Sequence, residues 1–437
     1  MNDRLTAIFR ATIFHTPKDP FHEPLALMEF ADGGLAVEDG RILRCADYSE
    51  VSRAYPDAVV HDLRGRFILP GFVDTHVHFP QVRILGGLGF TLLDWLEQLT
   101  LPEEARLADA NYAGTIAGEF VQALAAHGTT TALVFGSHFA SATAALFDAA
   151  AQHGLRVASG LVMSDRGLRP ELHHTPDAAY RDSSALIEHF HCEGRLRYAV
   201  TPRFALSTSE AMLEVCQSLL EEHPDARFTT HINENAEEIK EVARLFPGAK
   251  DYLAVYEKYG LVGRRSVLAH NIHASANELS RLSERRASIA HCPSSNAALG
   301  SGIFPMARHV AYQIRFALGT DVGGGTGFGM MKEALAAYLM QRLAPSPLIL
   351  VPATMLFLAT RAGAEALAME DEIGDFGEGK SADFVVLAAP AGSVLEGRLK
   401  CTDTPDQILA ALFTLAGTES VSQVRVAGDI VFRRESV

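Results

Sequence analysis

The sequence is poor in cysteine, and its five cysteines include no CxxC pair. An odd number at long spacings argues against a disulfide framework and a cysteine-type zinc site, and it indicates the cytosol. Long hydrophobic runs are also missing. The longest uncharged run of interest, 343–360, contains three prolines and predicts a loop followed by a buried helix rather than a membrane span. Arg10 interrupts the apolar stretch at the N-terminus, so we expect no signal peptide.

Positive charge is scarce as well. Lysine and arginine total 38 against 53 aspartates and glutamates, which gives a net charge of −15. An acidic surface repels phosphate backbones and anionic lipids, so we expect neither a nucleic-acid nor a membrane partner. Hydrophobic residues make up 48% of the 437 positions, enough for a sizeable core. The length predicts one large barrel with a smaller domain, or about three units.

Short β-branched runs alternate with helical patterns from residue 71 onward. Eight runs read as strands: 72–78, 129–136, 156–163, 197–202, 227–231, 266–270, 287–292 and 315–321. Eight strand–helix units in this length predict an α/β protein of the (β/α)₈ TIM-barrel type, for which about 250 residues are typical. A doubly wound open sheet is the alternative, because alternation alone does not distinguish closed from open sheets.

The two ends of the chain lack obvious crossover helices and contain short strands with Gly and Asp turns. They predict a small β-sandwich-like domain built from residues 1–68 and 373–437, beside a barrel of residues 69–372. The segment GDFGEGKS (374–381) matches the letters of a phosphate-binding loop. That loop requires a strand before it and a helix after it, whereas here a strand follows. We therefore predict a turn that leads into the terminal β domain.

Histidines and one aspartate close several of the predicted barrel strands. His76 and His78 end the first strand, His231 the fifth, His270 the sixth, and Asp321 the eighth. Side chains two residues apart on a strand point the same way, and the carboxyl ends of barrel strands form the active-site face. His76, His78, His231 and Asp321 together match the donors that a divalent metal requires.

The scarcity of lysine bears on how many metal ions the site holds. The chain has seven lysines: Lys18, Lys240, Lys250, Lys258, Lys332, Lys380 and Lys400. None lies at the end of a predicted barrel strand, where a carboxylated lysine could bridge two ions. The sequence therefore predicts a single metal ion, and the ligand set suits iron as well as zinc.

A single metal with an open coordination position lowers the pKa of its bound water to about 7 and so provides hydroxide at neutral pH. Glu234, three residues after His231, could donate a proton to the substrate; its alternative role is a carboxylate in the first turn of a helix. His270 could hold the hydroxide by a hydrogen bond, and Asp321 could accept its proton. Arg203 could donate to a substrate carbonyl, or instead form a surface ion pair.

Six segments resemble the amidohydrolase superfamily and, within it, the guanine deaminases. They are PGFVDTHVHFPQ (70–81), TPRFALS (201–207), HINENAEE (231–238), LAHNIHAS (268–275), AHCPSSNAALGSG (290–302) and LGTDVGGG (318–325). The resemblance covers the whole barrel. It also accounts for a β domain made from both ends of the chain.

The resemblance implies hydrolytic deamination of guanine to xanthine and ammonia by a cytoplasmic homodimer with one Zn²⁺ per chain. It places His76, His78, His231 and Asp321 on the metal ligands. It places Glu234 on the proton shuttle and His270 on the residue that orients the attacking water, with Asp321 also catalytic. The positions that contact the substrate are Gln81, Arg203, Phe204, His231, Glu234 and, by its place near the pocket, Trp95.

Two alternatives stay open at this point. One is a related deaminase or hydrolase acting on another purine, a pyrimidine or a triazine; Gln81, Arg203 and Phe204 favour guanine. The other is a non-catalytic binding protein on a degenerate barrel. Such a protein loses metal ligands, whereas this sequence retains all four and Glu234 as well.

Overall fold

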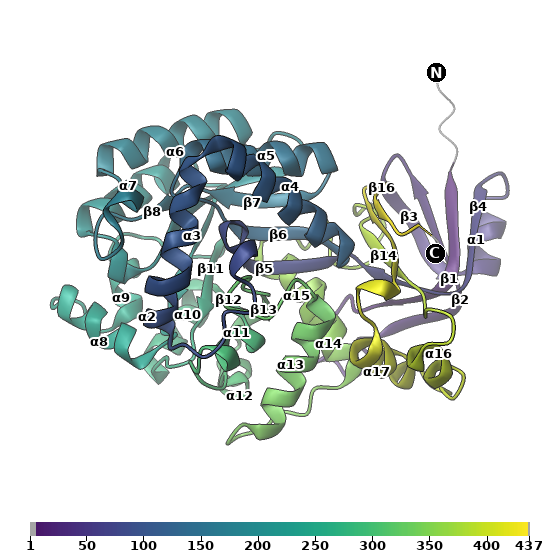
Figure 1. Ribbon diagram of the computed structural model, residues 1–437. Coiled ribbons are helices and arrows are strands. Elements are labelled where there is room, and N and C mark those ends of the chain that lie inside the picture. The colour runs from purple at the N-terminus through teal and green to yellow at the C-terminus, as the bar shows by residue number, and fades with distance from the viewer. Residues whose placement is uncertain (1–5, 436–437) are drawn as a thin grey trace.

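The computed structural model describes residues 6–435, which form two separate β-sheets with helices around them (Figure 1). The larger sheet is parallel, and its main strands follow one another in chain order. Its strands are β5 (Phe72–His78), β6 (Thr129–Phe135), β7 (Arg156–Gly160), β9 (Leu196–Pro202), β10 (Arg227–Ile232), β11 (Ser266–His270), β12 (Ser288–His291) and β13 (Arg315–Leu318), with the short β8 (Val162–Met163) beside β9. The predicted (β/α)₈ barrel is confirmed.

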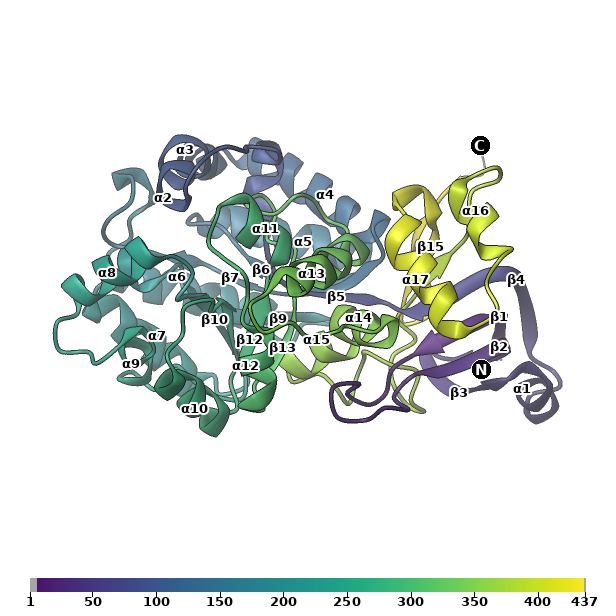
Figure 2. The same cartoon turned by 90° about the horizontal axis from the view of Figure 1, so that it is seen from below.

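Helices cover the outside of this barrel, as Figures 1 and 2 show. They are α4 (Ala110–Ala126), α5 (Ala140–His153), α6 (Pro176–Phe190), α7 (Glu210–Glu222), α8 (Ala236–Leu245), α9 (Tyr252–Glu257), α10 (Ala276–Arg285), α11 (Pro293–Ala298), α12 (Met306–Ala311), α13 (Met330–Leu343), α14 (Pro352–Ala359) and α15 (Arg361–Ala366). Local sequence explains where several of them begin. Asp109 accepts hydrogen bonds from the first turn of α4, and Ser209 does the same for α7.

A run of short helical turns between β5 and α4 lies over the carboxyl ends of the strands. It comprises η1 (Phe79–Ile84), α2 (Leu92–Trp95), the π-helical turn η2 (Leu96–Thr100), α3 (Leu101–Ala105) and η3 (Arg106–Ala108). Three further 3₁₀ turns are η4 (Pro170–Leu172), η5 (Ala205–Ser207) and η6 (Thr418–Ser420). We call residues 92–105 the cover segment.

The second sheet is built from both ends of the chain, as predicted. Its strand order is β16-β15-β14-β4-β1-β2-β3, and only β1 and β4 pair in parallel. The strands are β1 (Ala7–His15), β2 (Met28–Glu38), β3 (Arg41–Asp47), β4 (Val59–Pro70), β14 (Phe384–Leu387), β15 (Val421–Val426) and β16 (Asp429–Arg433), with α1 (Tyr48–Ala54) after β3. An apolar cluster that includes Phe9, Leu35 and Phe384 forms its core. The domain limits at residues 68 and 372 stay a prediction.

Helices α16 (Val394–Leu399) and α17 (Pro405–Leu415) interrupt the C-terminal strands, and the sequence analysis did not predict them. Helix α17 buries Leu409, Leu412 and Phe413 and packs against α13 and α14 of the barrel (Figure 2). The segment 374–381 forms turns before β14, as predicted, and Lys380 pairs there with Asp375 at 2.6 Å. Within residues 6–435, no helix is both long and apolar enough to span a membrane.

Asp74 joins the two end strands of the barrel sheet. Its buried carboxylate accepts hydrogen bonds from the backbone amides of His76 (3.2 Å) and Thr320 (3.0 Å), and from the Thr320 hydroxyl. The amide of Asp321 also donates to the carbonyl of His76 at 2.8 Å. Together these bonds hold the segment after β13 against β5, so the residues at the two strand ends keep a fixed spacing.

The close approach of β7 and β9 yields a prediction for stability. A Cβ atom on Gly160 would lie 1.9 Å from the Ala199 carbonyl oxygen, so Gly160→Ala forces the strands apart. We expect the free energy of unfolding, measured by denaturant titration, to fall by about 1–3 kcal/mol. Gly114→Ala on the exposed face of α4, where nothing lies within 4 Å, is the control and should be neutral or slightly stabilising. Equal stability of the two variants would contradict this account.

Candidate active site

Four side chains from three strand ends meet at the carboxyl face of the barrel. His76 and His78 come from β5, His231 from β10, and Asp321 from the loop after β13. The Nε2 atoms of His76 and His78 lie 3.2 Å apart, and Oδ1 of Asp321 lies 3.3 Å from each. Donor atoms bound at about 2.0–2.1 Å around a tetrahedral metal are separated by about 3.3 Å, so this spacing fits one ion. A ring nitrogen of His231 completes the group of histidines.

The hydrogen bonding of His231 fits a metal ligand. Its Nδ1 lies 2.7 Å from the carbonyl oxygen of Arg203, an acceptor only, so Nδ1 carries the proton and donates. Nε2 then keeps its lone pair for a metal, the arrangement found around metal-bound histidines. Burial lowers the pKa of His231 well below its ordinary value, and the ring is therefore neutral.

Asp321 supplies the negative charge of the site. Burial alone would raise the pKa of its carboxyl, yet contacts with His76 and His78 hold that pKa well below its ordinary value. Asp321 and His270 both have positive φ angles, 49° and 70°, in the left-handed region that non-glycine residues seldom adopt. Such conformations persist only where the surrounding structure determines them, and they concentrate at functional sites.

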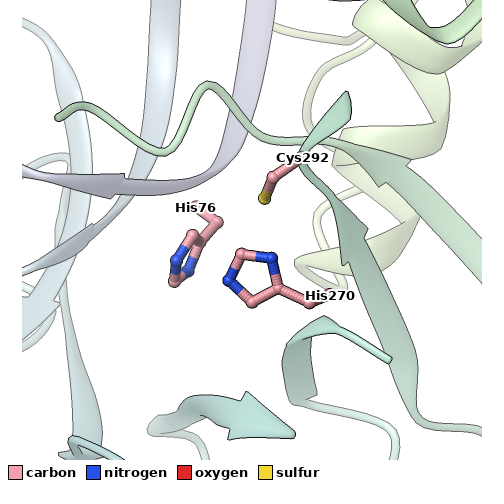
Figure 3. A group of neighbouring side chains, drawn as sticks. All are labelled: His76, His270 and Cys292. Carbon is pink, nitrogen blue, oxygen red and sulfur yellow. The ribbon is translucent and has the colours of Figure 1, made fainter. Parts of the chain in front are cut away.

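A second group of possible metal donors shares His76 with the first. The Cys292 thiol, just after β12, lies beside the rings of His76 and His270 (Figure 3). Burial raises the pKa of this thiol well above its ordinary value, which keeps it protonated and a poor ligand. His270 donates from Nδ1 to Oδ1 of Asn296 at 2.9 Å. Cys292 is therefore a neighbour of the first group of donors and does not suit the role of a ligand.

A third group lies on the surface and does not suit a metal. The backbone amide of Tyr198 donates to Nδ1 of His191 at 2.9 Å, so the proton of a neutral ring is on Nε2. That nitrogen lies 3.0 Å from Oδ2 of Asp225, to which Cys192 also donates. With its proton on Nε2, His191 has no lone pair to offer an ion.

Glu234 lies beside the proposed metal centre and outside the helix that follows. Asn235 is the N-cap of α8, and Glu238 completes its capping box, so Glu238 has the first-turn role considered for Glu234. The two carboxylate oxygens of Glu234 have separate contacts: Ser301 donates to Oε1 at 3.0 Å, and Nε2 of His270 lies 3.4 Å from Oε2. Burial, reinforced by the charge of Asp321, raises the pKa of Glu234 to about 8.

A small cavity opens between this centre and the cover segment. Its lining residues are His78, Gln81, Leu92, Trp95, Leu96, Arg203, Phe204, His231, Glu234, His270, Leu299 and Asp321. The structure thus brings together all four positions that the resemblance assigned to the substrate alone: Gln81, Trp95, Arg203 and Phe204. Trp95 is buried, and its indole nitrogen has no partner within the described chain.

Arg203 is buried, with 3% of its surface exposed, which rules out the surface ion pair considered from the sequence. Its partner is Glu104 on α3, a residue that sequence reasoning missed. Nη1 of Arg203 lies 2.8 Å from both carboxylate oxygens, and Nε2 of Gln81 donates to Oε1 at 2.8 Å. In the sequence, Glu104 is one of two adjacent glutamates at the start of a short helix, a common pattern with no functional signal.

Comparison with known proteins agrees with this geometry. A family model described as the amidohydrolase family matches residues 67–431, which includes every residue of the proposed site. The chain therefore belongs to the amidohydrolase family.

Individual relatives point to one activity within this family. The chain is 57% identical over 435 residues to a probable guanine deaminase of Deinococcus radiodurans, covering 98% of this chain and 99% of the relative. Its fold is similar to that of Escherichia coli guanine deaminase, with a TM-score of 0.94 and 36% identity, covering 99% of this chain and all of the other. The guanine deaminase of C. acetobutylicum, with guanine bound in its active site, has a TM-score of 0.89 and 25% identity, over 98% of this chain and all of that one.

The metal content of two variants should show which of the two overlapping groups of donors binds the ion. His78 belongs to one group and Cys292 to the other. We expect His78→Ala to lose most bound metal, measured by elemental analysis after dialysis, because a ligand is removed. Cys292→Ala should keep about one ion per chain. Metal loss in Cys292→Ala with retention in His78→Ala would reverse the assignment, and two tightly bound ions in the parent would contradict a single-metal site.

Proposed function

We propose that this chain is a guanine deaminase, which hydrolyses guanine to xanthine and ammonia. The observation that carries the proposal is the pocket itself. It places Arg203 and Gln81 on one wall and Glu234 and His270 beside a group of metal donors. The relatives named above, matched over nearly their whole length, support the same reaction.

The metal would be held by His76, His78, His231 and Asp321. We propose zinc, because nitrogen and carboxylate donors at tetrahedral spacing suit that ion. When bound, the metal supplies Lewis-acid activation of water. The neutral His231 and the ionised Asp321 already have the protonation states that metal binding requires.

His270 and Glu234 handle protons beside this centre. Nδ1 of His270 donates to Asn296, so in the neutral ring Nε2 is an acceptor that can take a hydrogen bond from the attacking water. The carboxyl of Glu234, with its pKa near 8, exchanges a proton close to neutral pH. We propose that Glu234 takes one proton from the attacking water and delivers it to a ring nitrogen as the carbon–oxygen bond forms at the amino-bearing carbon. It then takes the remaining proton of the added hydroxyl group and passes it to the amino group, which leaves as ammonia when the carbon–nitrogen bond breaks and the new carbonyl forms.

Substrate selection follows from the hydrogen-bond donors of Arg203 and Gln81, which line the pocket. A guanidinium group carries only donors, so Arg203 pairs with the 6-carbonyl of guanine and finds no acceptor in the 6-amino group of adenine. Adenine also lacks the 2-amino group that the reaction removes. A site built around a polar group of its substrate can reject an analogue lacking it by about 10⁴-fold. Phe204 and Trp95 contribute the apolar walls of the pocket.

Arg203→Leu tests this selection. We expect it to raise KM and lower kcat/KM for guanine while leaving the metal content unchanged, because the donors to the carbonyl are lost and the metal ligands are not. Steady-state rates of parent and variant on guanine, adenine, cytosine and 8-oxoguanine measure it. Efficient deamination of adenine by the parent, or unaltered guanine kinetics in the variant, would favour a related deaminase with another substrate.

Glu234→Gln tests the proton shuttle. The amide keeps the shape of the side chain and cannot transfer a proton, so kcat should fall by about 10²–10⁴-fold with metal content retained. Glu237→Gln, an exposed carboxylate in the first turn of α8, is the matched control and should leave kcat unchanged. Guanine turnover by Glu234→Gln within a few-fold of the parent would remove Glu234 from the mechanism.

We further propose that the enzyme acts in guanine catabolism, as a homodimer in the cytoplasm. All five cysteines are free thiols, which suits a reducing compartment. Leu343 and Ile349, at the end of α13 and in the loop beyond it, are 71% and 73% exposed, and apolar side chains so placed suit contact with a second copy.

A further inference from the structure

Glu104 lies behind the substrate-facing wall of the pocket and is almost completely buried, with 2% of its surface exposed. Two hydrogen-bond donors and a neighbouring imidazole surround its carboxylate. Nη1 of Arg203 and Nε2 of Gln81 approach it at 2.8 Å, and Nδ1 of His138 lies 3.4 Å from Oε2. Burial lowers the pKa of His138 well below its ordinary value, so this ring is neutral. Glu104 and Arg203 therefore cancel each other's charge in a site that receives an uncharged base.

These contacts settle which atoms of Gln81 face the pocket. The backbone amide of Gly323 donates to Oε1 of Gln81 at 3.0 Å, and Nε2 donates one hydrogen to Glu104. The amide cannot be reversed, because that would set its NH₂ group against another donor and its oxygen against a carboxylate. Gln81 is left with one free N–H. Its Oε1 is already engaged by the amide of Gly323, so the N–H is the group that we expect Gln81 to offer the substrate.

Arg203 is constrained in the same way. Within residues 6–435, Nη1 is the one guanidinium nitrogen of Arg203 that donates to another residue, and both of its contacts are to Glu104. Nη2 and Nε keep their hydrogens for a ligand. Glu104 thus holds two flexible side chains, Arg203 and Gln81, in positions where the N–H groups that it does not bind remain as donors.

Glu104 also connects parts of the site that are distant in sequence. It belongs to the cover segment, which carries the pocket residues Trp95 and Leu96, whereas Arg203 follows β9. Through Gln81 it reaches Gly323, two residues after Asp321. A single carboxylate therefore ties the cover segment to the pocket wall and to the loop of a proposed metal ligand.

We propose that Glu104 is a positioning residue for substrate recognition: it acts through Arg203 and Gln81 and holds their remaining donors in place for a carbonyl-bearing purine. This inference rests on the proposed guanine deaminase activity and adds to it the residue that organises the recognition wall. Glu104 touches neither the proposed metal ligands nor Glu234, so it should affect binding of the base more than the proton transfers.

Glu104→Gln removes the charge and replaces one acceptor oxygen by a donor that faces other donors. We expect kcat/KM for guanine to fall by about 10- to 100-fold, mainly through KM, the range for losing a hydrogen bond to a charged group. The metal content should stay unchanged. The matched control is Glu103→Gln: Glu103 is its neighbour on α3, is also buried, and pairs with Arg106 and Tyr112 away from the pocket. This control should keep KM within two-fold of the parent.

A double-mutant cycle with Arg203→Leu separates positioning from folding. If Glu104 acts through Arg203 and Gln81, the part of its effect that passes through Arg203 is already lost in Arg203→Leu, so the double variant should lose less than the product of the two single effects. If the double variant instead loses the full product of the two single effects, or if Glu104→Gln retains a parental KM, the proposal is overturned. If Glu104→Gln fails to fold, Glu104→Asp replaces it in the double-mutant cycle. This variant keeps the charge on a shorter side chain, and the same two outcomes apply.

The parent enzyme distinguishes this proposal from the proposed function. A parent that does not turn over guanine would overturn the proposed activity. The cycle would then use the base from the substrate panel that the parent does deaminate. Non-additive effects of Glu104 and Arg203 on the KM of that base would still support the positioning role, and additive effects would overturn it.

Discussion

The site depends on the bonds that hold the first and last strands of the barrel together. Asp74 accepts hydrogen bonds from the backbone of both His76 and Thr320, and it is buried where water does not compete. Burial raises the pKa of its carboxyl to about 7 even with these donors present, a sign of how far the position is removed from solvent. Because His76 itself donates to Asp74 and Asp321 directly follows Thr320, these bonds set the spacing between the residues on the two sides of the proposed metal centre.

The buried charged groups around the pocket differ in whether they have a charged or imidazole partner, and this difference matches their proposed roles. Arg203 is neutralised by Glu104, and Asp321 lies against two imidazoles. Glu234 faces a serine hydroxyl and a histidine nitrogen, and burial, reinforced by the charge of Asp321, raises the pKa of its carboxyl. A paired charge stays ionised and holds a position, whereas an unpaired buried carboxyl can gain and lose a proton. The recognition wall, the metal donors and the proton-transfer group thus differ in environment although they share one small cavity.

The interpretation of the sequence was strongest where a local pattern has one structural meaning. Buried β-branched runs alternating with helical segments can hardly form anything but parallel strands with crossovers, and His76 and His78, two residues apart, must share a face. Patterns with several meanings were less informative. Helix α17 was not predicted, although Thr404 before Pro405 is a helix start signal and Leu409, Leu412 and Phe413 lie at helical spacing. Glu103 and Glu104 are adjacent and chemically identical, yet one binds surface partners and the other faces the pocket wall.

By itself, the sequence determined the alternation of parallel strands with helices, the small sheet made from both ends of the chain, and the set of residues available to bind a metal. It did so because strand periodicity and the positions of strand ends are properties of short segments. Only the tertiary structure decided which nitrogen of His231 is free, which buried acid balances Arg203, and which way the amide of Gln81 points. Each of these depends on a partner distant in the sequence. Hydrogen bonds between such residues form only when the chain brings their donors and acceptors together, so no local pattern records them.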